Sequence, residues 1–252
     1  MANIIRSSKS GSQWTQNDLI AFNIRIVEQN SVDFFGVDIK NINISDYIHR
    51  IDNSDDQLSA DLKNYIKLVS TSPGEESAVV DFAATLLRLL KYTDIEHFVR
   101  VRKRISLFMC GEQTIAETDV CIMSLNQILF LLQVDKTLIN NTDPEPQLIA
   151  EAIAAFQNNY NINKRYPNSK EYDKYIFPGI TMIGTYPTFY KINITNNLNN
   201  CIKLGIFPKD ETIIYRFNPI IDISTSRLGI QHPDNKLSIL KAFKAFRQFM
   251  PF

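Results

Sequence analysis

The sequence lacks an excess of charge of either sign. Lysine and arginine together number 27, aspartate and glutamate also number 27, and the formal net charge is zero. Proteins that bind polyanions through their overall charge are usually basic, so any contact with nucleic acid requires a local patch here. Charged residues make up 21% and hydrophobic residues 44%, which is typical of a chain that can bury a core.

Cysteine and histidine are also scarce. Cys110, Cys121 and Cys201 lie far apart, form no CxxC pair and are odd in number. This argues against a disulfide scaffold, and we expect reduced cysteines, two of them in apolar strands. The histidines are isolated, so no zinc site is expected. The patterns GxSxG, GxxxxGK(S/T) and GxGxxG are absent, which argues against a simple serine hydrolase, a P-loop protein and a dinucleotide-binding protein.

Long apolar runs are absent as well. No run approaches the about 18 residues that a membrane-spanning helix needs. The start, MANIIRSSKSGSQWTQND, lacks the apolar segment of a signal peptide. We therefore expect an intracellular protein, cytoplasmic or nuclear.

The polar start is followed by patterned sequence. Residues 1–13 are rich in serine and glycine and are expected to be disordered. Residues 14–252 are expected to form a single domain, with a helical part over about 14–70, a core over about 72–195 and a second helical part over about 196–252.

Hydrophobic periodicity predicts an α/β fold, with helices on both faces of a small mixed sheet. Strand patterns lie at 104–110, 118–124 and 127–136, and the last two are close enough to form a hairpin. The third has no polar face for five residues, which favours a central strand. The other expected elements are helices over about 16–29, 59–69, 73–91 and 144–159, strands at 179–185 and 188–195, a short helix ending at Gly205, and an amphipathic helix over about 235–250.

The third expected helix has the clearest beginning. Ser72 can cap it, Pro73 suits its first position, and Glu75 completes a capping box. Glu76 lies on the apolar stripe of this helix, which is unusual for an acid. Either Glu76 has a function, or it is a second acid favoured by the helix dipole.

Three ionisable residues fall where the hairpin and this helix can meet. Asp119 begins one strand, Lys136 closes the next, and Glu76 can reach the same edge. Alternate strand residues share a face, so Val134 and Lys136 point the same way, and Asp119 joins them if the register allows. Carboxylates that hold Mg²⁺ and a lysine that orients water or neutralises charge can together hydrolyse phosphodiesters. A structural ion pair between Asp119 and Lys136 is the alternative.

These residues resemble the motif of the PD-(D/E)xK nuclease superfamily, which has the restriction-endonuclease-like fold with an αβββαβ core. The strings TDVC, QVDK, DPEPQLIAEAIAAFQ and TMIGTYPTFYK are similar to a set of uncharacterised fungal proteins, in which the second string reads VQEDK. The resemblance runs from about Trp14 to the end and implies extra terminal helices around the core. It also implies Asp119 as a metal-binding acid, Lys136 as the motif lysine, Gln147 as a supporting glutamine, and DNA, or else RNA, as the ligand.

Val134 stands where the motif has its second acid. Asp135 faces the opposite layer, although a main-chain carbonyl, of Val134 or of Asp135, can still ligate a metal. Asp119 and Glu76 remain, with Glu117 as a further acid, which is enough for weak binding of Mg²⁺ or Mn²⁺. The resemblance therefore implies a weakened metal-dependent nuclease. The alternative is an inactive member that binds nucleic acid or a protein partner.

A basic run enters the first core strand. Arg100, Arg102, Lys103 and Arg104 can contact phosphates. Runs of this kind are more often a solvated surface, so the run alone is a weak indication of nucleic-acid binding.

Overall fold

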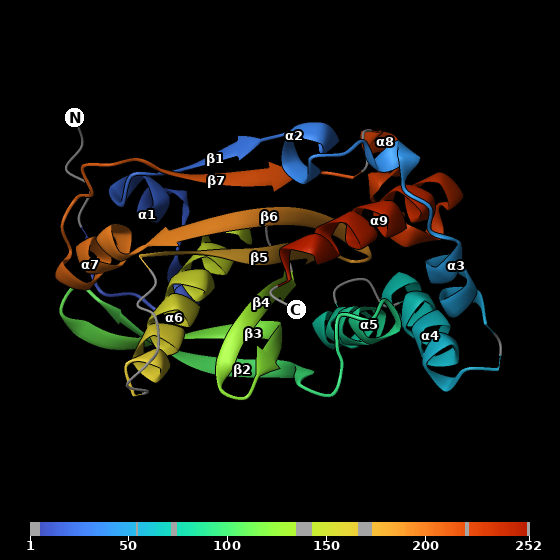
Figure 1. The fold of residues 1–252 in the computed structure, drawn as a ribbon, viewed down its shortest axis with the longest axis horizontal. Coiled ribbons are helices and arrows are strands. Elements are labelled where there is room, and N and C mark those ends of the chain that lie inside the picture. Colours follow the sequence, from blue (N-terminus) through green and yellow to red (C-terminus); the bar gives the residue numbers. More distant parts are fainter. Residues whose placement is uncertain are drawn as a thin grey trace.

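Seven strands form one mixed sheet within the parts of the chain that the computed structural model describes, residues 6–53, 55–71, 75–134, 143–165, 173–219 and 222–250 (Figure 1). Their order across the sheet is β1-β7-β6-β5-β4-β3-β2. The strands are β1 (Ile24–Glu28), β2 (His97–Met109), β3 (Glu112–Ser124), β4 (Gln127–Val134), β5 (Lys174–Ile183), β6 (Tyr186–Thr195) and β7 (Thr212–Phe217). The predicted α/β class, with helices flanking a mixed sheet, is confirmed.

The middle of the sheet is built around one crossover. β2, β3 and β4 form an antiparallel meander, and β4 pairs in parallel with β5. Parallel neighbours need a connection across one face of the sheet, and the helix α6 (Glu145–Asn163) supplies it. β5, β6 and β7 are antiparallel, and β1 joins β7 in parallel at the far edge.

The helices fall into two groups, one on each face of the sheet. In Figure 1, α6 lies toward the left of the sheet, and α5 and α9 lie toward the right. Besides α6, the helices are α1 (Gln16–Ala21), α2 (Ser31–Phe35), α3 (Ser45–Asp52), α4 (Gln57–Thr71), α5 (Glu76–Leu89), α7 (Asn196–Leu204), α8 (Ile223–Ser226) and α9 (Pro233–Phe246). None of the helices in the described ranges is both long enough and apolar enough to cross a bilayer.

Two apolar cores lie on opposite faces of the sheet. Phe130 and Leu132 of β4 pack in the core that contains α5 and α9, which we call the α5/α9 core. Leu131 packs in the core that contains α6, which we call the α6 core. β4 is therefore covered on both faces, as its unbroken apolar pattern predicts.

The prediction of a helix over about 16–29 is wrong for the second half of that range. α1 ends at Ala21, and Asn23 has a left-handed backbone with φ 53°. The chain continues as β1, which pairs with β7 near the other end of the sequence. Ile26 and Val27 have helical spacing, but main-chain pairing with β7 overrides that local pattern. Neither β1 nor β7 is expected from the sequence, so the sheet is larger than the small sheet predicted.

The chain is placed from Arg6 onward, including most of the segment whose composition predicts disorder. Residues Gly11–Gln13 form a short 3-10 helix, and Gly11 is buried against Ala116 of β3. A Cβ atom on Gly11 would lie 2.9 Å from the Cβ of Ala116, which is closer than carbon atoms can pack without a shift. The expected cap at Ser72 and Pro73 lies outside the described residues.

Two buried carboxamides fix α6 onto the strands. Gln157 accepts a hydrogen bond from the Phe108 amide at 2.8 Å and donates to the Phe108 carbonyl at 3.0 Å. Asn159 accepts from the Ile128 amide at 2.9 Å and donates to the Ile128 carbonyl at 2.7 Å. Each carboxamide thus makes the pair of main-chain hydrogen bonds that a neighbouring strand would make with one residue of β2 or β4. These bonds satisfy buried main-chain groups that would otherwise have no partner.

We expect Asn159→Ala to lower the free energy of unfolding by about 2–5 kcal/mol. The substitution removes both partners of Ile128, and each unsatisfied buried group costs about 1–3 kcal/mol. Urea unfolding followed by circular dichroism measures the loss. Asn161→Ala, at an exposed position of the same helix, is the matched control and should change stability by less than about 0.5 kcal/mol. Equal losses for the two variants would contradict the role of Asn159.

Candidate functional site

Asp119 on β3 contacts the end of β4. Its Oδ2 atom accepts a hydrogen bond from the main-chain amide of Val134 at 2.8 Å, and the residue is only 7% exposed. The ladder between these strands reaches as far as Val120 opposite Leu132. The Asp119 carboxylate therefore bonds the strand just beyond the last pair of the ladder. The structure thus brings together the predicted acid and the position of the missing motif acid.

The ladder between β2 and β3 is broken at Asp119. Arg102 stands opposite Asp119 in the register, but the two do not pair, although pairs form on both sides. Arg102 has φ 49°, a left-handed conformation that a non-glycine residue adopts at a cost of about 1–2 kcal/mol. Side chains that are an even number of residues apart in β2 point to opposite faces of the sheet on the two sides of the break. Val99 packs on the α5/α9 core, whereas Ile105 packs in the α6 core.

Val134 can supply neither a carboxylate nor an unused carbonyl. Its side chain is 1% exposed and packs in the α5/α9 core. Its carbonyl accepts a hydrogen bond from Nε2 of Gln133 at 3.2 Å, so one lone pair of the proposed ligand is already engaged. The adjacent Lys136 and Asp135 lie outside the described residues.

The remaining predicted acids lie on separate elements. Glu76 is the first residue of α5, is half-buried, and lies on a helix that packs in the same core as Val134. Glu117 forms an ion pair with Arg104, with 2.7 Å between Oε2 and Nε, on an exposed part of the hairpin. Its charge is therefore already matched by a cation.

A magnesium site requires several oxygen ligands around one point. Within residues 6–134 and 143–250, apart from the short gaps given above, no group of three or more Asp, Glu, His or Cys side chains is placed to hold a metal ion. The residues described do not fit a complete magnesium site, and no hydrolytic step is assigned to a bound metal.

The N-terminal half of α6 covers a largely buried polar layer, of which the sequence predicts only Gln147. Glu145 Oε1 accepts hydrogen bonds from Tyr190 Oη at 2.8 Å and from Arg216 Nη1 at 2.7 Å. Thr181 Oγ1 lies 3.2 Å from the same Tyr190 hydroxyl. The residues of this α6 polar layer are Gln133, Glu145, Gln147, Glu151, Thr181, Tyr190 and Arg216.

Gln147 and Glu151 complete the layer from the helix. They lie one turn apart on α6, and Gln147 Nε2 donates to Glu151 Oε1 at 3.2 Å. Glu151 is fully buried, which is unusual for an acid in an otherwise apolar helix. Gln133 stands beside Thr181 in the register of β4 and β5, and its buried Oε1 has no hydrogen-bond partner among the described residues. The spacing of four residues between Gln147 and Glu151 is the signal by which the pair could have been found.

Charges in this layer shift two pKa values. Burial raises the pKa of Tyr190 well above its ordinary value, and the negative charge of Glu145 raises it further. Burial alone would lower the pKa of Arg216, but its hydrogen bond to Glu145 and the charge of Glu145 outweigh this and raise it. Tyr190 is therefore a neutral donor, and Arg216 remains charged.

The basic run lies on the surface around the ladder break. Arg100, Arg102 and Arg104 are exposed, and Lys103 is half-buried. Lys103 pairs with Thr118, the residue before Asp119. The run therefore lies on both sides of the candidate site along the outer strand of the sheet.

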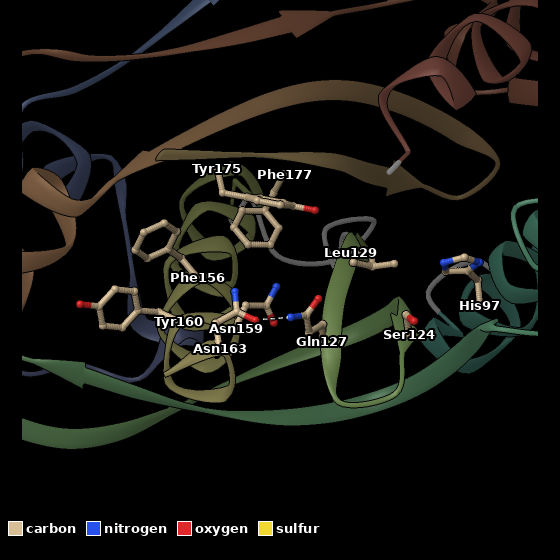
Figure 2. A pocket seen from close by; sticks show the side chains of 10 residues that line it. All are labelled: His97, Ser124, Gln127, Leu129, Phe156, Asn159, Tyr160, Asn163, Tyr175 and Phe177. Atoms are coloured by element: carbon tan, nitrogen blue, oxygen red, sulfur yellow. Dashed lines mark hydrogen bonds between the residues drawn. The ribbon is translucent and has the colours of Figure 1, made fainter. Parts of the chain in front are cut away.

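A separate pocket of about 260 Å³ opens at the other end of β4 (Figure 2). Its walls combine aromatic rings and carboxamides from α6, β4 and β5, among them Tyr175, Asn159 and Gln127. Gln127 Nε2 donates to Asn163 Oδ1 at 2.6 Å within this pocket.

No protein-family model and no curated protein sequence matches the chain.

We expect Arg102→Gly to raise the free energy of unfolding by up to about 1 kcal/mol, although glycine normally weakens a strand. Glycine adopts a positive φ without a steric cost, whereas a β-branched residue adopts it only at a high steric cost. Arg102→Val is the matched variant and should be destabilising, despite its higher strand propensity. Urea unfolding of the two variants gives the comparison. A more stable Arg102→Val would show that the ladder break is not present in solution.

The raised pKa of Tyr190 predicts that its contribution to stability is lost at high pH. Because the folded pKa lies above the unfolded value of about 10, this contribution is complete below about pH 10 and declines as pH rises toward the folded pKa. Tyr190→Phe should be destabilised relative to the unmodified protein at pH 8, and this difference should narrow by about 1.4 kcal/mol at pH 11. Urea unfolding at the two pH values tests this. A difference independent of pH would be inconsistent with a buried neutral hydroxyl.

Proposed function

We propose that the chain is a PD-(D/E)xK nuclease-like protein in which Val134 weakens metal-dependent hydrolysis of DNA phosphodiesters. The order of the elements supports this proposal. α5, β2, β3, β4, α6 and β5 follow one another as an αβββαβ core, with an antiparallel meander and a fourth strand parallel to the third. The strands β6, β7 and β1 and the terminal helices are additions to that core.

One observation carries the proposal, namely the hydrogen bond of 2.8 Å between the Asp119 carboxylate and the Val134 amide. A nuclease of this class requires the acid of its second core strand to lie beside the end of the third. The left-handed Arg102 opposite Asp119 adds weight, because strained backbone that survives in a strand is common at functional sites.

Each predicted residue has a proposed role. Asp119 is the metal-binding acid, with Glu76 as a second acid from α5. Lys136 would orient the water or neutralise charge on the phosphate, and Gln147 would support the site from α6. Because the side chain at Val134 is apolar and buried, a metal would be bound weakly and cleavage would be slow.

The burial of Val134 also favours a second candidate function. A site that has replaced an acid by a core residue has lost a ligand and gained stability. Such a protein can persist as a catalytically inactive module that binds nucleic acid or another protein. The two functions differ in cleavage: the weakened nuclease cleaves slowly and needs Asp119 to do so, whereas the inactive module does not cleave.

We expect little or no cleavage of supercoiled plasmid by the unmodified protein with Mg²⁺, and at most trace nicking with Mn²⁺. Asp119→Asn should abolish the nicking that occurs with Mn²⁺. Val134→Glu should raise metal-dependent cleavage by about tenfold or more, since each 1.4 kcal/mol of transition-state stabilisation is a factor of ten. Asp119→Asn in the Val134→Glu background should abolish the gain.

Val134→Gln is the matched control, because it has the same length as glutamate without the charge. Both substitutions place a polar group in the α5/α9 core, so circular dichroism must first show that each variant is folded. Brisk cleavage by the unmodified protein that Asp119→Asn leaves unchanged would refute the site. A folded Val134→Glu variant that cleaves nothing would favour the binding module.

A further inference from the structure

A shallow hollow lies between the β2–β3 hairpin and the C-terminal half of α6. It has a volume of about 720 Å³. The charged side chains that line it are all cations, Lys103, Arg165 and Lys203. No ion pair within the described part of the chain involves any of these three. Most of its other polar lining consists of carboxamides, which donate as well as accept hydrogen bonds.

The hollow neighbours both the candidate site and the pocket of Figure 2. Lys103, one of its lining residues, pairs with the residue next to Asp119. Asn126 and Asn158 also line the hollow, and the residues that follow them, Gln127 and Asn159, line the pocket. A hydrogen bond of 3.0 Å from Asn158 Nδ2 to the Asn126 carbonyl joins the turn to α6 between the two depressions.

The pocket has the groups that recognise a nucleobase. Tyr175 is half-buried in its wall, with its ring centroid 4.5 Å from that of the fully buried Phe177, and carboxamides of Gln127 and Asn163 lie across from it (Figure 2). Flat bases stack on aromatic rings, and carboxamides bond the edges of bases. A base within a duplex is stacked on both sides, so only an unpaired base can enter a pocket of this kind.

Cations gather where the hollow passes α6. Lys164 and Lys203 both lie over the ring of Tyr160, at 4.5 and 5.8 Å from its centroid. Burial lowers the pKa of Lys203, and the like charge of Lys164 lowers it further. The positive charge of Lys203, which lines the hollow, suits a phosphate group.

We infer that the hollow and the pocket together bind single-stranded nucleic acid, with phosphates on Lys103, Arg165 and Lys203 and one unpaired base in the pocket. The inference takes its ligand class from the proposed function and so rests on it. The binding itself requires no cleavage, no metal and no contact with Val134.

Fluorescence anisotropy with labelled thymidine and uridine oligonucleotides of about 20 residues tests the inference. The variant with Lys103→Ser, Arg165→Ser and Lys203→Ser should bind more weakly. Its slope of log affinity against log salt, between about 50 and 200 mM, should be smaller by about 2, because each phosphate contact on a single strand contributes about 0.7. Tyr175→Leu should weaken binding about tenfold or more and leave the slope unchanged.

The matched control replaces Lys67, Lys209 and Arg227 by serine, which removes the same residue types at exposed positions away from the hollow. This control should bind like the unmodified protein. Absence of binding at about 50 mM salt would overturn the inference, as would equal weakening by the control. Unchanged affinity of Tyr175→Leu would remove the base pocket from it. Binding is measured without a metal ion, and cleavage by the unmodified protein and by Val134→Glu is measured separately, so failure of the nuclease proposal is distinguishable from failure of this one.

Discussion

The parallel pairing of β4 with β5 is the constraint on which the rest of the structure depends. Two adjacent parallel strands require the chain to return across one face of the sheet, and α6 makes that return. α6 is apolar over most of its surface because it lies between the sheet, α1 and the N-terminal segment. Its position then fixes the buried polar layer at one end of the helix and the aromatic pocket at the other.

Polar groups, rather than apolar packing alone, set how α6 sits on the sheet. Gln157 and Asn159 bond the main chains of β2 and β4, so that sliding α6 by one residue would leave four main-chain groups without partners. At the other end of α6, Glu145 holds the helix to the sheet through side chains, because it accepts hydrogen bonds from Tyr190 and Arg216. The two depressions beside α6 therefore lie at fixed positions relative to β2 and β4.

The region around Asp119 differs from the regular sheet near it. A broken ladder, a left-handed arginine and a carboxylate on the neighbouring strand coincide there, while the adjacent Val134 is ordinary core. This combination is what a site would retain if one ligand had been exchanged for packing. It is consistent with both the proposed weakening of hydrolysis and the proposed binding surface, which does not depend on the missing acid.

Several elements could be predicted from the sequence because their signals are local. The unbroken apolar run in β4, the start of α6 and the glycine that ends α7 specify strand, helix and boundary within a few residues. The pairing of β1 with β7 could not be predicted, because Ile26 and Val27 fit a helix equally well until a distant strand offers hydrogen bonds. The motif of Asp119, Val134 and Lys136 could be found in the sequence, but the contact of Asp119 with the Val134 amide depends on a register that no single strand encodes. Composition and periodicity specify which residues can carry charge and which apolar residues can form a core. Which of these residues meet depends on the folded chain, because the free energy of a buried ion pair or hydrogen bond depends on partners that are far apart in the sequence.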